Sequence, residues 1–419
     1  MTDSPASAPG GWRGHERGSG EYRRVMLAMF FAGVAIFAQL YAPQAVLPEI
    51  SHAFGIDAPT SALMVSMATL GVAASVLPWS IVADRIGRVP AMGWSICLAV
   101  LFSLISVLMP SFELSLAARL LEGLSMGGVP AVAHAYLNEE LHPKAAPAAA
   151  GVFVAGNTVG GMSGRLIAAP VGEAFGWQWG SLAVTGLGLA SAIAFLALIP
   201  RSRGYAPDPE RTVARLSADA LRNVGRHLRT PRLMALYSVG LLLMGGFVAV
   251  YNYLGYRLTG EPYGLPTWIV GFVFLAYLAG TVSSPIAGRL AAAHGRKRTM
   301  LAACAVFVAG AALTLLEPLW AVIAGLLVLT AGLFGAHSVA AGWAGASATT
   351  GRAQSTALYN FGYYAGSSAF GYIGGLFFVG MGWPGLVLLV TLLALASAAL
   401  VLAFLPWRPK GWQLGDPAP

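Results

Sequence analysis

Long apolar runs divide this 419-residue chain into two halves. Because a helix that crosses a bilayer needs about 20 apolar residues, each run is long enough to span one. Six runs precede a polar gap and six follow it, at 25–47, 60–83, 91–110, 113–137, 146–173 and 178–200, and then at 233–257, 266–288, 299–316, 318–343, 353–377 and 384–405. The pattern predicts an all-α polytopic membrane protein with 12 transmembrane helices in two pseudo-symmetric six-helix bundles.

The composition excludes several other classes of protein. Hydrophobic residues make up 57% of the chain and charged residues 10%, whereas soluble domains have about 45–50% apolar and about 25% charged residues. A soluble enzyme, a disordered chain and a nucleic-acid-binding protein are therefore not expected. The two cysteines, Cys97 and Cys304, lie inside apolar runs and are predicted to be core side chains rather than a disulfide or a metal site.

Basic residues concentrate in alternate loops, and this asymmetry predicts the orientation. The opposite loops carry the base Arg257 and the acids Glu49, Glu113, Glu173, Glu261 and Glu317. Loops on the side of the N-terminal tail carry Arg85, Arg88, Lys144, Arg289, Arg296, Lys297, Arg298, Arg352, Arg408 and Lys410. Both termini are therefore expected in the cytoplasm, and the net charge of +8 follows from these loops.

Five segments follow from these boundaries. They are an N-terminal tail at 1–24, a first bundle at 25–200, a basic linker at 201–232, a second bundle at 233–405 and a C-terminal tail at 406–419. Within the linker, apolar residues recur at helical spacing at Val213, Leu216, Leu221, Val224 and Leu228. The linker is expected to be either an amphipathic helix on the inner membrane surface or a solvated tether between the bundles.

The two halves share an internal repeat. Gly87 and Arg88 align with Gly295 and Arg296, and a second alignment pairs Gly156, Gly160 and Trp177 with Gly362, Gly366 and Trp383. Two six-helix halves related in this way are typical of a two-bundle transporter. A stripe of small residues at Gly156, Gly160 and Gly164 is also expected to let another helix approach closely.

The loop after the second run resembles a motif of the major facilitator superfamily. Ser80–Val89 (S-I-V-A-D-R-I-G-R-V) departs from the family's loop 2–3 pattern at its two ends and follows it at Asp84, Arg85, Gly87 and Arg88. The resemblance implies that these four residues gate transport, as a cytoplasmic latch that stabilises the outward-facing state. It places Asp84 against the N-terminal end of the eleventh helix, where a helix dipole favours an acid by about 0.3–1 kcal/mol.

Two further motifs look like those of proton-coupled members of the same superfamily. Arg119–Gly128 (R-L-L-E-G-L-S-M-G-G) resembles the helix 4 motif, with Glu122 in the position of a glutamine. Gly156–Gly161 (G-N-T-V-G-G) resembles the helix 5 antiporter motif, with Asn157 in place of a proline.

Longer segments are similar to efflux proteins of the YnfM and AraJ types, in the drug:proton antiporter branch. These segments are Tyr136–Pro143, Gly156–Ile167, Asn252–Leu258 and Ala336–Ala340. The resemblance implies a monomeric secondary transporter of a bacterial inner membrane. It would export small organic molecules, such as drugs or sugars, in exchange for protons by alternating access. Its partners would be the substrate, protons and the lipid bilayer, and no cofactor is implied.

Charged residues inside the membrane are the candidates for proton coupling. Glu122 is the acid that falls well within a span, at a cost of about 2.5–3.5 kcal/mol on insertion scales. Arg119 lies three residues earlier on the same helix face. Glu122 is predicted to bind and release the proton while Arg119 tunes the pKa of Glu122. The alternative is a permanent ion pair that locks this helix to a neighbour. His337 is a further candidate proton carrier, or else a hydrogen-bonded structural residue.

Candidate substrate-binding residues are basic, amide or aromatic. Arg165 and Arg119 lie at similar depth and are predicted to clamp a carboxylate or phosphate. The alternative is that Arg165 pairs with Glu122 or a backbone carbonyl. Amides and tyrosines that suit an adaptable pocket, or else core packing, are Asn157, Gln39, Tyr41, Tyr251, Asn252, Tyr359, Asn360 and Tyr363.

Enzyme motifs are missing from the sequence. It has no phosphate loop, nucleophile elbow or metal-spaced cluster, so no enzymatic activity, cofactor or metal is expected. Proton-driven efflux is the expected function. Uptake of an organic anion or nutrient, and a membrane sensor that does not transport, are the alternatives.

Overall fold

The computed structural model describes residues 12–205 and 213–407, which are almost entirely helical. The first half contains α1 (Gly20–Tyr41), η2 (Ala42–Ala45), α2 (Leu47–Phe54), α3 (Ala58–Ile86), α4 (Arg88–Leu108), α5 (Phe112–Met126), α6 (Gly128–Glu140), α7 (Ala146–Phe175) and α8 (Trp177–Leu198). After α9 (Val213–Leu228), the second half contains α10 (Pro231–Thr259), α11 (Thr267–Val273), η3 (Phe274–Tyr277), α12 (Leu278–His294), α13 (Arg296–Leu313), α14 (Leu319–Ser347) and α15 (Arg352–Phe404).

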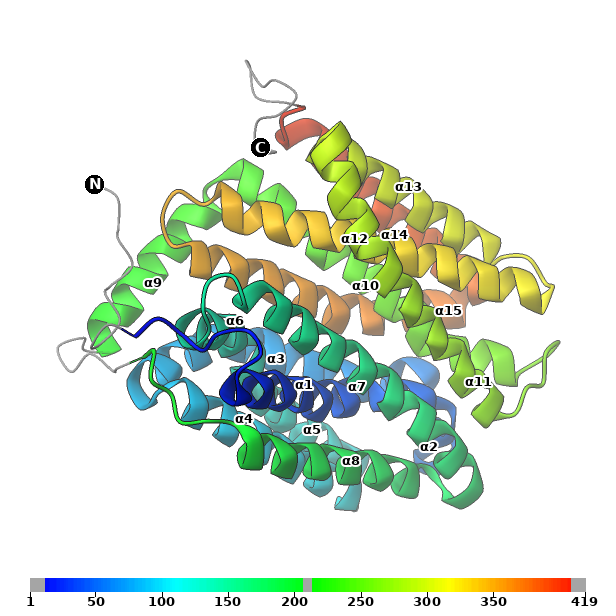
Figure 1. Ribbon diagram of the computed structural model, residues 1–419. Helices are drawn as coiled ribbons and strands as arrows, with labels where there is room; N and C mark the ends of the chain where they lie inside the picture. The colour runs from blue at the N-terminus through cyan, green and yellow to red at the C-terminus, as the bar shows by residue number, and fades with distance from the viewer. Residues whose placement is uncertain (1–11, 206–212, 408–419) are drawn as a thin grey trace.

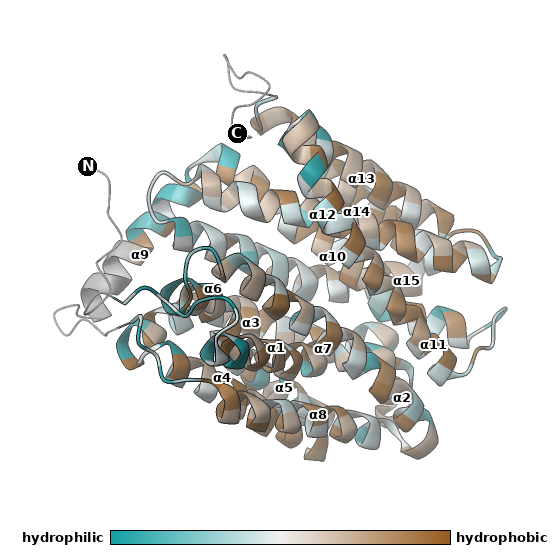
Figure 2. Cartoon of the chain, in the orientation of Figure 1, coloured by the Kyte–Doolittle hydropathy of each residue, from teal (hydrophilic) through white to brown (hydrophobic). Residues whose placement is uncertain are grey.

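The helices pack as two groups, α1–α8 and α10–α15 (Figure 1). They meet chiefly along α3 and α15, and where α7 contacts α11. We call the end with Gly87 and Gly295 the tail side and the end with Gly55, Gly176 and Gly264 the far side. In Figure 1, α9 lies at the left on the tail side, and α2 and α11 lie at the right on the far side. Apolar residues predominate along the helices (Figure 2).

Polar residues fix where several helices begin. Ser19, Asp57 and Ser111 precede α1, α3 and α5, and each side chain accepts a hydrogen bond from a backbone N–H in the first turn. The distances run from 2.9 Å at Asp57 to 3.3 Å at Ser111. Such N-caps contribute about 1 kcal/mol each, because the first N–H groups of a helix otherwise have no partner.

In the described part of the chain, eight helical segments are long and apolar enough to cross a membrane, whereas the sequence predicts twelve spans. One difference is that α15 forms a single segment of 53 residues with non-helical dihedral angles at Gly382. Another is the fourth predicted span, which is divided at Gly127 into α5 and α6. In addition, Arg296, Lys297 and Arg298 begin α13, and glycines with Asn157 and Arg165 lower the hydropathy of α7.

The internal repeat appears in the backbone. Gly87 joins α3 to α4 with φ 98° and ψ 157°, and Gly295 joins α12 to α13 with φ 92° and ψ 146°. Gly176 between α7 and α8 and Gly382 within α15 also have positive φ, and each is followed by a tryptophan. These angles are accessible essentially to glycine alone, so the aligned glycines form equivalent turns in the two halves.

The glycine stripe of α7 packs against α1. A methyl group added to Gly156, Gly160 or Gly164 would lie under 3.0 Å from the backbone of Phe30, Val34 and Ala38, respectively. The second half repeats the arrangement, because Gly362 and Gly366 of α15 meet the backbone of Tyr237 and Leu241 of α10 in the same way. The predicted close approach is therefore present in both halves.

Helix α9 connects the groups on the tail side. Arg226 Nη1 donates to Thr350 Oγ1 at 2.8 Å, and the imidazole of His227 bonds the Gly351 carbonyl at 3.1 Å. The helix therefore packs on the turn between α14 and α15. The predictions for Val213 and Leu216 concern side chains outside the described residues, as do those for 1–11, 206–212 and 408–419.

Candidate functional site

A cavity of about 250 Å³ lies between the two groups of helices. Its lining includes six of the residues that the sequence predicts as functional: Tyr41, Asn157, Arg165, His337, Asn360 and Tyr363. The remaining lining is largely aromatic, with rings from Phe37, Phe153 and Phe334. Because α6, the first part of α7 and the first part of α15 supply most of these residues, the cavity lies on the tail side of Arg165.

Arg165 is fully buried at the end of this cavity. Its Nε and Nη2 both donate to Gln44 Oε1, at 2.9 and 2.5 Å. Nη1 donates to the Gly161 carbonyl at 2.6 Å, and Nη2 also donates to the Tyr277 hydroxyl at 3.0 Å. The rings of Tyr41, Phe274 and Tyr277 lie over the guanidinium, with centroids 4.5–5.1 Å from Cζ. The cation is thus held by neutral acceptors and ring faces.

Other predicted substrate residues lie outside the lining. Gln39 donates to the Ala35 carbonyl at 2.6 Å, and Tyr251 bonds Thr330 at 2.9 Å. Asn252 accepts from Gln44 at 2.7 Å, so Gln44 connects Arg165 of the first half to α10 of the second. Tyr359 is buried behind His337 and bonds its Nδ1 at 2.9 Å, which orients the imidazole toward the cavity.

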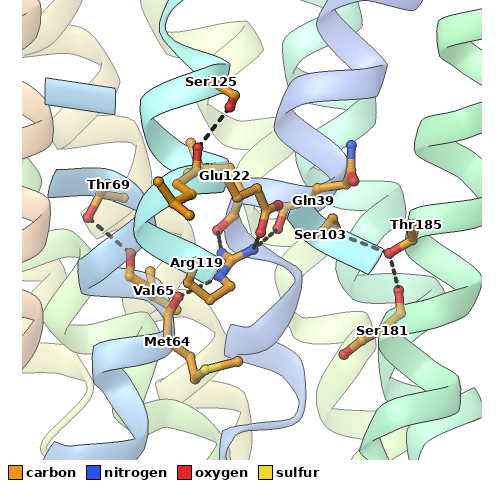
Figure 3. Close-up of polar contacts among 12 residues, drawn as sticks. Gln39, Met64, Val65, Thr69, Ser103, Arg119, Glu122, Ser125, Ser181 and Thr185 are labelled. Carbon is orange, nitrogen blue, oxygen red and sulfur yellow. Dashed lines mark hydrogen bonds and ion pairs between the residues drawn. The ribbon is translucent and has the colours of Figure 1, made fainter. Parts of the chain in front are cut away.

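Arg119 and Glu122 form a buried ion pair within the first half (Figure 3). Arg119 Nη1 donates to Glu122 Oε2 at 2.6 Å, and both side chains are at most 3% exposed. The remaining carboxylate oxygen, Oε1, has no hydrogen-bond partner among the described residues. The pair contributes no lining to the main cavity, so the structure does not bring Arg119 and Arg165 together around one ligand space.

The position of Arg119 follows from the end of α1. Pro43 has no N–H, so the carbonyl of Gln39 lacks its usual helical donor four residues later. Arg119 supplies donors there: Nη1 lies 3.4 Å from Gln39 O, and Nη2 lies 2.9 Å from Leu40 O. Its Nε donates to the Met64 carbonyl of α3 at 2.8 Å. One guanidinium therefore joins α5 to both α1 and α3.

The end of α1 connects the ion pair to the cavity. Arg119 holds the carbonyls of Gln39 and Leu40, and the next residue, Tyr41, lines the cavity and lies against Arg165. Three residues after Tyr41, Gln44 accepts a hydrogen bond from Arg165. A few residues of α1 and η2 thus connect the Arg119–Glu122 pair to Arg165.

The predicted gating residues form a cluster on the tail side. Arg88 bonds Asp84 Oδ1 at 2.5 Å and both oxygens of Glu139 at 3.0 and 3.1 Å. Tyr205 donates to the Asp84 carbonyl, and its ring lies over the Arg88 guanidinium. Arg85 is exposed. Within the described residues, Asp84 therefore pairs with Arg88 in this conformation. The family resemblance instead placed it against the start of α15. Glu139 and Tyr205 were not predicted.

On the far side, two acids of the first half meet the start of α11. Thr267 Oγ1 donates to Glu49 Oε1 at 2.5 Å, and the Trp268 N–H donates to Glu173 Oε2 at 2.7 Å. Tyr256 of α10 donates to the Leu47 carbonyl at 2.9 Å and bonds the hydroxyls of Ser51 and Ser61. We call these contacts the far-side clasp. From the sequence, Glu49 and Glu173 served only to assign the membrane orientation, and their contacts with α11 were not predicted.

The far-side clasp should respond to pH through Glu49. Burial raises the pKa of this carboxyl above its ordinary value of 4.5, the Glu173 charge adds to the rise, and the Thr267 hydrogen bond opposes it. Opening would expose the carboxyl and return its pKa toward that value. The closed state therefore holds more protons between the two pKa values, and lowering the pH through this window should favour closure.

Spin labels can measure this closure. We expect the distance between labels at Ala53→Cys and Glu261→Cys, both exposed far-side positions, to shift toward the closed value as pH falls, in a background without Cys97 and Cys304. Glu49→Gln should remove this dependence while Glu113→Gln, at an exposed acid, should keep it. An unchanged pH response in Glu49→Gln would contradict the assignment.

Comparison with known proteins agrees with this architecture. Residues 29–281 match the family model of the Major Facilitator Superfamily. The chain is 40% identical over 386 residues to the inner membrane transport protein YnfM of Escherichia coli, covering 92% of this chain and 91% of YnfM.

Solved transporter structures share the fold. A bacterial homologue of the human lysosomal transporter Spinster, in an inward-facing and occupied conformation, superposes with a TM-score of 0.69 at 16% identity, over 92% of this chain and 95% of that chain. The nucleoside transporter NupG superposes with a TM-score of 0.72 at 12% identity, over 92% of this chain and 100% of that chain. The protein is a multi-pass membrane transporter that belongs to the major facilitator superfamily.

Proposed function

We propose that this protein is a proton-coupled antiporter that exports small organic molecules across a bacterial inner membrane. The observation that carries the proposal is the Arg119–Glu122 pair, an ionisable couple buried among apolar helices and connected through α1 to the cavity. Such groups are costly in a membrane and are usually functional. The tail side is cytoplasmic in this proposal, in agreement with its basic loops.

Glu122 is the proton carrier in this mechanism. Ionised, it compensates the Arg119 charge and holds the guanidinium in place. Protonation removes the negative charge, so Arg119 keeps only neutral acceptors and Glu122 no longer fixes the guanidinium against their shared helix, α5. Because Arg119 also bonds the Gln39 and Leu40 carbonyls, the end of α1 becomes free to shift against α5. That end carries Tyr41 and Gln44, which contact Arg165 at the cavity.

Alternating access is the second part of the proposal. Twelve spans form two six-helix bundles, with the two predicted spans of α15 separated at Gly382. In the present conformation the far-side clasp joins the halves, and the cavity lies toward the tail side. Rocking of one bundle against the other would break the clasp and expose the cavity to the far side.

Movement of protons in inverted membrane vesicles tests this function. Acidified vesicles with a pH-sensitive fluorophore receive sugars, organic anions or cationic dyes one at a time. Efflux by antiport predicts compound-dependent proton release that requires the protein and disappears with an uncoupler. A response only in vesicles of the opposite orientation would favour uptake of an organic anion, for which Arg165 is the supporting observation. No substrate-dependent flux in either orientation would contradict transport and favour a sensor.

A further inference from the structure

The main cavity carries a single permanent charge. Among the described residues that line it, Arg165 is the one with a formal charge, and none is an aspartate or a glutamate. His134 and His337 are the other ionisable groups besides tyrosines. A ligand therefore meets a positive end at Arg165 and a neutral wall elsewhere.

No acid among the described residues pairs with Arg165 to compensate its charge. All of its hydrogen bonds go to an amide oxygen, a backbone carbonyl and a phenol, as described above. Coulombic attraction between unit charges strengthens as the dielectric constant falls, so Arg165 attracts an anion more strongly at this buried site than it would in water. The guanidinium fork also matches the two oxygens of a carboxylate in geometry.

Gln44 occupies the position that suits a carboxylate. A single oxygen, Oε1, accepts from both Nε and Nη2 of Arg165, which is the side of the fork that carboxylates bind with two bonds. Replacing this neutral acceptor with an anionic one strengthens both bonds, because charge-assisted hydrogen bonds are roughly twice as strong as neutral ones.

The rest of the cavity suits a small, flat and apolar body. Rings from Phe37, Phe153, Phe334 and Tyr363 face it. Since liquid water occupies about 30 Å³ per molecule, a space of 250 Å³ corresponds to about eight waters, which favours a small ligand. Aromatic faces favour an offset or edge-on partner ring.

We propose that the cavity binds a small aromatic monocarboxylate, whose carboxylate displaces the Gln44 amide from Arg165. This inference rests on the proposed function in one respect, that the cavity is the transport site. A cation of the same size would meet the Arg165 charge without an acid to offset it. A neutral sugar would supply no negative charge to Arg165.

Displacement of Gln44 would allow ligand binding to affect the contacts between the two halves. Gln44 Nε2 donates to Asn252 Oδ1 at 2.7 Å, and this bond joins the end of α1 to α10. A carboxylate on Arg165 frees the Gln44 side chain from one of its two partners, so the bridge between halves becomes mobile. Substrate binding would thereby loosen the closed side of the transporter.

Equilibrium binding to the purified full-length protein in lipid nanodiscs tests the proposal, with radiolabelled benzoate as the probe. We expect saturable benzoate binding that cyclohexanecarboxylate competes weakly and that benzyl alcohol and benzylamine do not compete. Equal competition by the neutral or cationic analogue would overturn the proposal.

Three variants make the test specific to Gln44 and Arg165. Gln44→Glu should supply the anion internally and weaken benzoate binding more than tenfold, whereas Gln44→Ala should retain or improve it. Gln178→Glu adds the same charge at an exposed far-side position and should leave binding unchanged. Unaltered affinity in Gln44→Glu would overturn the proposal. If that variant does not fold, Arg165→Gln should show the same loss, and unaltered affinity there would be equally decisive.

The two proposals can fail separately. Benzoate binding without substrate-dependent proton movement in vesicles would overturn the proposed antiport and leave the anion site standing. Proton movement with other compounds, together with no benzoate binding, would overturn the anion site alone.

Discussion

Replacing Arg119 with methionine should lower the free energy of unfolding by about 3–5 kcal/mol, because Glu122 would remain buried without its partner. The same change removes the donors that serve the Gln39, Leu40 and Met64 carbonyls. The loss should therefore exceed that of the opposite variant, Glu122→Gln. In Glu122→Gln the new amide oxygen can still accept from Arg119, and Arg165 demonstrates that this fold holds a buried guanidinium on neutral acceptors.

The buried thiol of Cys304 can report this difference. Cys97 is exposed and Cys304 is buried, so a Cys97→Ala background leaves one thiol that reacts with a maleimide dye only after unfolding. The midpoint temperature of labelling should fall strongly for Arg119→Met and only slightly for Glu122→Gln. Equal midpoints for the two variants would contradict the predicted extra loss from the buried, unpaired Glu122 and the three carbonyl contacts.

Replacing Gly164 with alanine should separate α1 from α7. The new methyl group would lie under 3.0 Å from the carbonyl of Ala38, and neither backbone can move without disturbing the rest of the stripe. Overpacking of this kind costs about 1–3 kcal/mol. Because Gly164 lies one residue before Arg165, the shift should also weaken ligand binding in the cavity.

Gly151→Ala is the matched control on the same helix. A methyl group there meets nothing within 4 Å, so this variant should be neutral or slightly more stable. The Cys304 assay and benzoate binding measure both variants. If Gly164→Ala and Gly151→Ala behave alike, close packing at the stripe is not a determinant of stability.

Most of the helices and the internal repeat could be predicted from the sequence because they depend on local properties of the chain. Apolar length and periodic glycines are local properties of a chain in a membrane, so the runs and the stripe at Gly156, Gly160 and Gly164 could be read directly. The division of the fourth span at Gly127 was not predicted, although two glycines and Pro130, which has no N–H to donate to the Met126 carbonyl, mark the place. The non-helical dihedral angles at Gly382, by contrast, fall between the last two predicted spans, at 353–377 and 384–405.

The candidate site was harder to predict because depth along a helix does not fix direction around it. Arg119 and Arg165 lie at similar depth by residue count, but they face different spaces. The roles of Gln44 and Tyr277 as partners of Arg165 depend on how α1 and η3 pack across the interface. Only their residue types, an amide and an aromatic phenol, could have marked them as candidates.

The central claim is that Glu122 carries the coupled proton, and flux in inverted vesicles tests it most directly. Wild type, Glu122→Gln and the exposed-acid control Glu113→Gln are compared for substrate-dependent proton release and for substrate exchange without a gradient. The account predicts that Glu122→Gln loses proton release but keeps exchange, while Glu113→Gln keeps both. Proton release by Glu122→Gln at the wild-type rate would contradict it.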